Sequence, residues 1–103
     1  MERFNLPYVV VFIPAYNEEH RLPPTLARIL DFLHTHYQGT FEIIVVDDGS
    51  KDGTEKSVHA FVIQYLSVRL VSLGQNQGRG VAVRQGVNMA KGDLILEMDA
   101  DGS

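Results

Sequence analysis

Two carboxylates, Asp99 and Asp101, stand two residues apart directly after a mainly apolar run at residues 93–98. In an extended segment the side chains at positions i and i+2 point the same way, so this pair is predicted to face one ligand together. Magnesium and manganese prefer carboxylate oxygen and are typically held by one or two carboxylates together with substrate phosphates. The pair therefore predicts a site for a hard divalent cation, Mg²⁺ or Mn²⁺.

Three further segments place polar side chains after apolar runs. Tyr16 and Glu18 follow the first run, and Tyr16 offers both a flat face for stacking and a hydroxyl group. Asp47 and Asp48 follow the second run, and adjacent carboxylates repel one another unless a cation lies near them. Arg79 follows the third run and could bind a phosphate through two parallel hydrogen bonds, although an isolated loop arginine is more often a solvated charge.

Other polar residues of these loops have an ordinary structural explanation. Helices need N-caps and turns favour Asp, Asn, Ser and Gly, which accounts for Ser50, Asp52, Asn76 and Gly78. Asp52, with Glu55 three residues later, also has the spacing of a capping box in which Asp takes the role of Ser or Thr.

The elements that must position these side chains follow two hydrophobic patterns. Mainly apolar runs at residues 8–13, 41–46, 68–73 and 93–98 predict four strands covered on both faces, the first of them continuously apolar and stopping before Pro14. Between the runs, apolar residues recur at helical spacing and predict three amphipathic helices. These residues are Leu22, Leu26, Ile29, Leu30 and Leu33, then Val58, Phe61, Val62, Tyr65 and Leu66, then Val83, Val87 and Ala90.

The order β-α-β-α-β-α-β predicts an α/β fold, a three-layer α/β/α arrangement around a mainly parallel, Rossmann-like sheet. The crossovers of such units are right-handed. Ligands of open α/β sheets bind outside the carboxyl ends of the strands. All four polar segments follow such ends, so we expect them to converge on one rim of the sheet.

Composition narrows the function classes. The chain has 103 residues, which fits one small domain, and a formal net charge of −4, which argues against nucleic acid as a partner. Nucleotide binding stays open because a metal can supply positive charge. The absence of cysteine excludes disulfides, thiolate catalysis and cysteine zinc sites. The N-terminus has no signal-peptide pattern and residues 9–13 are too short an apolar stretch to span a bilayer, so a cytoplasmic protein is expected.

Four motifs occur in a fixed order along residues 8–103. They are Pro14-Ala15-Tyr16-Asn17-Glu18-Glu19, Val45-Val46-Asp47-Asp48-Gly49-Ser50 with Asp52-Gly53-Thr54, Asn76-Gln77-Gly78-Arg79-Gly80 with Ala82 and Arg84-Gln85-Gly86, and Asp99-Ala100-Asp101. Together they resemble the family 2 glycosyltransferases of GT-A fold, most of all the dolichyl- or polyprenyl-phosphate glucosyl- and mannosyltransferase branch. Gly102-Ser103 is more similar to the glucosyl than to the mannosyl group.

The resemblance implies transfer of glucose or mannose from a nucleotide diphosphate-sugar, carrying UDP or GDP, to a dolichyl or polyprenyl phosphate, with inversion at the anomeric carbon. Asp48 would hold the base or ribose edge, Asp99 and Asp101 the metal and diphosphate, and Arg79 is a candidate phosphate contact. The residues implied to bind the nucleotide sugar are Pro14, Ala15, Tyr16, Glu18, Val46, Asp48, Asp99, Ala100 and Asp101.

Family 2 enzymes continue well beyond the acidic motif. Residues 1–103 are therefore expected to form a single nucleotide-sugar-binding domain, the N-terminal donor-binding portion of a longer enzyme whose acceptor-binding segments lie downstream. No catalytic residue is assigned. Peripheral association with the cytoplasmic face of a membrane is a family expectation. The oligomeric state stays open, with a homo-oligomer among the alternatives because exposed sheet edges and apolar surface drive association.

The same residues are compatible with four other functions. Asp99-Ala100-Asp101-Gly102-Ser103 is similar to the nucleophile motif of Mg²⁺-dependent phosphohydrolases of the haloacid dehalogenase type, although that motif normally opens its domain. A nucleotidyltransferase usually has a glycine-rich, basic first loop, which is acidic here. A receiver-like module, and a nucleotide-binding fragment without turnover, are the non-catalytic alternatives.

Overall fold

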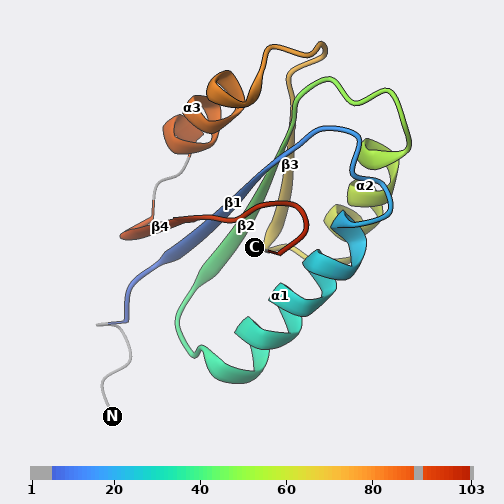
Figure 1. The fold of residues 1–103 in the computed structure, drawn as a ribbon. Helices are drawn as coiled ribbons and strands as arrows, with labels where there is room; N and C mark the ends of the chain where they lie inside the picture. The colour runs from blue at the N-terminus through green and yellow to red at the C-terminus, as the bar shows by residue number, and fades with distance from the viewer. Residues whose placement is uncertain (1–5, 90–91, 103) are drawn as a thin grey trace.

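The computed structural model describes residues 6–89 and 92–102 and confirms the predicted α/β class (Figure 1). Ala90, expected in the third helix, lies outside the described residues. The four strands form one parallel sheet in the order β3-β2-β1-β4. Helices α1 and α2 lie on one face of this sheet and α3 on the other, so the three layers are those expected. The elements are β1 (Val9–Ala15), α1 (Leu22–His36), β2 (Phe41–Asp47), α2 (Thr54–Gln64), β3 (Val68–Ser72), α3 (Arg79–Met89) and β4 (Leu94–Glu97).

The sheet separates two apolar clusters, and the alternation of β1 shows why its sequence is continuously apolar. Val11 and Ile13 face the cluster under α1 and α2, whereas Val10 and Phe12 face the smaller cluster under α3. Side chains of a strand point alternately to its two faces. A strand covered on both faces must therefore be apolar at every position.

Strand β1 runs two residues further than its sequence predicts, because Pro14 lies inside it. Pro14 pairs with Val46 of β2. On the other side, pairing with β4 ends at Phe12, whose carbonyl accepts from the amide of Met98. Alternate residues of a strand direct their backbone groups to the same neighbour, so the nitrogen of Pro14 faces the side where pairing has ended. The missing N–H therefore costs the sheet no hydrogen bond.

The prediction that the fourth strand is buried on both faces is wrong. Leu94, Ile95 and Leu96 are 46, 38 and 43% exposed. Within the described residues, β4 is an edge strand that pairs only with β1, and α3 packs over β1 and β2 instead. An apolar run thus marked a strand correctly but not its place in the sheet.

Helix starts were predicted with mixed success. Two prolines, Pro23 and Pro24, lie in the first turn of α1 as expected. The capping box at α2 is wrong: the N-cap is Gly53, and the carboxylate of Glu55 accepts a hydrogen bond from Ser72 instead of reaching back. In the described part of the chain, no helix has both the length and the apolar character needed to cross a bilayer.

Candidate functional site

The carboxyl ends of the strands meet at one rim, and the rim is hollowed by an open cleft of about 410 Å³. This volume lies within the range of small-molecule and cofactor sites. Parallel register places the ends of β1, β2 and β3 level with one another, through the pairs Ala15–Asp47 and Asp47–Ser72. The expectation that distant loops share one rim is therefore confirmed by the geometry.

The cleft brings together nine of the ten residues named from the sequence as nucleotide-sugar or phosphate contacts. The exception is Val46, whose side chain is fully buried against Phe12 and Ala82 on the α3 face of the sheet. The nine that line the cleft are Pro14, Ala15, Tyr16, Glu18, Asp48, Arg79, Asp99, Ala100 and Asp101.

Four residues that sequence reasoning did not assign to the site also line the cleft: Arg21, Asn76, Gly78 and Ala82. The sequence predicts only a turn role for Asn76 and Gly78. The sequence position of Arg21 could have indicated a role in the site, because Arg21 directly precedes a helix that has no acidic residue in its first turn. A cation is unfavourable at the positive end of a helix dipole, so its presence there indicates an anionic partner.

The first and second loops are joined by hydrogen bonds that fix the side of the cleft carrying Tyr16. The amide of Asn17 donates to Ser50 Oγ at 2.8 Å, and Lys51 N donates to Asn17 Oδ1 at 2.8 Å. Glu18 N donates to the buried Thr54 Oγ1, also at 2.8 Å. These bonds hold the loop after β1 against the start of α2. Ser50 therefore serves the structural purpose assigned to it.

The inference that the adjacent carboxylates of Asp47 and Asp48 need a nearby cation is wrong. Neighbouring residues at a strand end point to opposite faces of a sheet. Asp47 is bound by the amide and hydroxyl of Ser50. Asp48 accepts from the amides of Gln77 at 2.7 Å and Gly78 at 2.9 Å. Backbone and hydroxyl donors thus satisfy both carboxylates, and Asp48 holds the glycine-rich loop in place.

Burial raises the pKa of Asp47, hydrogen bonds from Ser50 lower it in part, and the neighbouring Glu55 raises it further. Asp47 is only 1% exposed. A carboxyl whose folded pKa lies above its ordinary value of 3.8 favours the folded state while it is protonated. That contribution is lost as the pH rises through the raised pKa.

We expect Asp47→Asn to raise the free energy of unfolding at pH 7 by a few tenths to about 1 kcal/mol, because a neutral amide of the same size avoids burying a charge. The advantage should shrink as the pH falls from 7 toward 4, since Asp47 of the unaltered protein then becomes protonated. Urea unfolding of both proteins across this range measures the difference. A gap that stays constant with pH would contradict the assignment to Asp47.

The acidic pair lies on a turn and not on an extended strand, so the geometric reason given for its common direction is wrong. Strand β4 ends at Glu97, and the amide of Gly102 donates to the carbonyl of Asp99 at 2.8 Å. Gly102 has a φ of 89°, a backbone conformation that residues with a side chain rarely adopt. Both carboxylates nevertheless line the same cleft, because the turn itself faces it.

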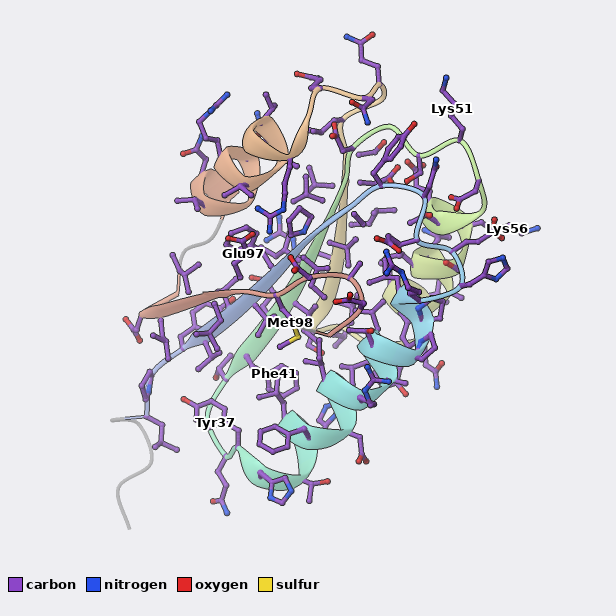
Figure 2. The ribbon with its side chains drawn as sticks, viewed as in Figure 1. Tyr37, Phe41, Lys51, Lys56, Glu97 and Met98 are labelled. Carbon is purple, nitrogen blue, oxygen red and sulfur yellow. The ribbon has the colours of Figure 1, made fainter. Side chains whose placement is uncertain are left out.

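Two arginines contact the acidic turn. Arg79 Nη2 lies 2.9 Å from Asp99 Oδ1 and also contacts Glu97, which is labelled in Figure 2 on the α3 side of β4. Arg21 Nη1 lies 3.7 Å from Asp101 Oδ2. Hydrogen bonds to Asp99 and Glu97 raise the pKa of Arg79 above its ordinary value. Each aspartate of the motif therefore has a guanidinium partner.

The residues present fit a hard divalent cation only if a ligand completes its coordination. Among residues 6–89 and 92–102, no three His, Cys, Asp or Glu side chains are grouped so that they could hold a metal by themselves. Asp99 and Asp101 supply two carboxylates at the open cleft, and Mg²⁺ or Mn²⁺ usually takes its other ligands from water and phosphates. The donor set is thus suited to a cation that binds together with a phosphate.

A parallel α/β sheet with a polar cleft at its carboxyl rim defines a Rossmann-like ligand-binding domain. Within that class the sequence is specific: the model of glycosyl transferase family 2 matches residues 10–103, and the chain belongs to this family. The resemblance drawn from the four motifs is confirmed. Membership in the family also removes the basis for the phosphohydrolase, nucleotidyltransferase and receiver alternatives.

Two relatives carry the same description. The chain is 41% identical over 102 residues to the dolichyl-phosphate beta-glucosyltransferase of Dictyostelium discoideum, covering 93% of the chain. It is 42% identical over 99 residues to that of Homo sapiens, covering 90% of the chain. The chain spans 31% of the length of each relative.

Solved structures agree with the fold. The mannosyltransferase PcManGT from Pyrobaculum calidifontis, in complex with GDP-Man and Mn²⁺, superposes with a TM-score of 0.75 at 29% identity over 92% of this chain and 28% of the other. S. aureus TarS in complex with UDP-GlcNAc gives a TM-score of 0.76 at 29% identity over 91% of this chain and 26% of the other. Both comparisons confirm the GT-A type of nucleotide-sugar-binding architecture.

Proposed function

We propose that this chain is the donor-binding part of an enzyme that transfers glucose from a nucleotide diphosphate-sugar to dolichyl phosphate with inversion. We propose glucose and not mannose as the sugar because the relatives at 41 and 42% identity are dolichyl-phosphate beta-glucosyltransferases. The observation that carries the proposal is the single cleft in which residues from all four strand ends meet.

The cleft offers a distinct surface to each part of such a donor. Tyr16 is 40% exposed and presents a ring on which a base can stack. Each carboxylate oxygen has two acceptor positions, so Asp48 can hold the loop amides and still accept from a ribose hydroxyl or a base N–H. The proposed nucleoside site therefore lies between Tyr16 and Asp48.

The diphosphate is proposed to lie over the acidic turn. Asp99 and Asp101 would hold Mg²⁺ or Mn²⁺ there. The solved structure of PcManGT, which is similar to this chain, is a complex with GDP-Man and Mn²⁺. Such a cation would stabilise the charge that develops on the diphosphate leaving group. Arg79, at the start of α3, lines the same part of the cleft and is the proposed phosphate contact.

Donor binding is the whole of the proposed role, because no cleft residue is assigned as the group that activates the acceptor. The chain spans 31% of relatives whose names state transfer to dolichyl phosphate. An acceptor of that kind is a lipid, so the proposed site of action is a membrane surface. We predict that the enzyme acts at the cytoplasmic face of that membrane.

Calorimetric titration of the 103-residue chain with UDP and with GDP, each with Mn²⁺ and with EDTA, tests this function. We expect one of the two nucleotides to bind measurably with Mn²⁺ and at least about tenfold more weakly with EDTA, because the cleft is acidic without the metal. Affinity that does not depend on the metal, or an absence of binding to both nucleotides, would count against the proposal.

A further inference from the structure

The lining of the cleft carries a net negative charge, which opposes the binding of an anionic ligand. Four carboxylates and two guanidinium groups line it, which leaves two formal negative charges. A diphosphate cannot approach the acidic turn favourably while Asp99 and Asp101 present their charge to it. The two arginines are therefore placed where both the aspartates and the diphosphate would compete for them.

The arginines reach the acidic turn from two sides of the molecule. Arg21 precedes α1 and Arg79 opens α3, and these helices lie on opposite faces of the sheet (Figure 1). Arg21 contacts Asp101 and Arg79 contacts Asp99. Each aspartate of the motif is thus paired with a guanidinium from a different layer.

Each arginine is also bound to a carboxylate outside the acidic motif. Arg21 Nε and Nη2 donate to the two oxygens of Glu18 at 2.7 and 2.6 Å, whereas its contact with Asp101 is 3.7 Å long. Arg79 contacts Glu97 through Nη2, the same nitrogen that contacts Asp99. A guanidinium has five donors in a rigid fork. Arg21 therefore can stay on Glu18 when its contact with Asp101 is given up.

We propose that Arg21 is an exchangeable partner of the acidic motif: it neutralises Asp101 in the metal-free protein and becomes a diphosphate contact when a divalent cation takes that carboxylate. Arg79 does the same for Asp99. This inference rests on the proposed function, since it names how the same cleft admits its metal and its anion. The exchange needs only a small movement, because Glu18 keeps the Arg21 guanidinium at the rim of the cleft.

The proposal predicts that removing the arginine has opposite effects on two ligands. In Arg21→Gln, Mn²⁺ alone should bind about two- to fivefold more tightly, because an exposed ion pair no longer competes for Asp101. UDP at saturating Mn²⁺ should bind about tenfold more weakly, because a charge-assisted hydrogen bond to the diphosphate is lost. Arg79→Gln should show the same two signs.

Electron paramagnetic resonance of free Mn²⁺ gives the first affinity, and calorimetry with UDP gives the second. The matched control is Arg69→Gln, which also removes one positive charge and one ion pair, to Glu42 at 2.9 Å, from a place that does not line the cleft. Arg69→Gln should leave both affinities within about twofold, which corrects for the general effect of charge.

Two results for Arg21→Gln would overturn the exchange. Weaker binding of both ligands would show that the arginine merely supports the turn, and unchanged UDP binding would show that it never reaches the diphosphate. Failure of the proposed function is distinct, because it appears in the unaltered chain as an absence of Mn²⁺-dependent UDP or GDP binding. Circular dichroism confirms that the variants are folded, as expected for a side chain 60% exposed.

Discussion

Asp101→Asn should lower the affinity of the chain for its nucleotide in the presence of Mn²⁺ by about a hundredfold, while the affinity measured with EDTA should not fall. Replacing a group that only supports a metal ligand already costs 10- to 100-fold in affinity, so loss of a direct ligand belongs at the upper end. Asparagine keeps the size of the side chain but removes the charge that holds a hard cation. The measurement is calorimetric titration with UDP or GDP at fixed Mn²⁺ and with EDTA.

Asp31→Asn is the matched control for this variant. Asp31 is exposed in the middle of α1 and does not line the cleft, so its replacement changes the net charge equally without touching the site. The thermal midpoint of Asp101→Asn should stay close to that of the unaltered chain, because the Asp101 side chain is 43% exposed. Mn²⁺-dependent binding that survives in Asp101→Asn would remove the carboxylate from the metal site.

Much of the fold could be predicted because hydrophobic patterns record burial directly. Val10, Phe12, Val11 and Ile13 must all be apolar if β1 is covered on both faces, and a continuous run of this kind is visible in the sequence. The position of the rim followed from the predicted strands, because parallel strands place their carboxyl ends together. The pattern fails at β4, because a run of apolar residues does not reveal which neighbours cover it.

The parts of the site that could not be predicted depend on partners distant in the chain. Arg21 lies 80 positions from Asp101, and nothing local to either residue shows that they meet. Asp48 was predicted to meet a ligand, but its hydrogen bonds to Gln77 and Gly78 arise only when two loops are packed together. Residue type and spacing thus located the chemistry, whereas the partner of each charge required the tertiary structure.

Packing between those two loops leaves no room for a side chain at Gly49. Gly49 has a φ of 75°, and a Cβ atom there would lie 2.3 Å from the backbone nitrogen of Asn76. The obstacle is backbone, so no side chain can turn aside to make room. We expect Gly49→Ala to lower the free energy of unfolding by about 3 kcal/mol or more, from strain at positive φ and from the clash together.

The same substitution should also weaken nucleotide binding by about tenfold, because the loop displaced by the new methyl group carries Asn76 and Arg79 into the cleft. Gly74→Ala separates the two causes. Gly74 has a φ of 81°, but its Cβ would meet no atom within 4 Å, so the variant should lose only about 1–2 kcal/mol and keep its affinity. Urea unfolding gives the stability of each variant. Calorimetry with UDP and Mn²⁺, under conditions in which both variants are folded, gives the affinity. Equal losses of stability in the two variants would show that backbone strain alone governs Gly49. Equal affinities for UDP would show that the contact between the loops does not position the site.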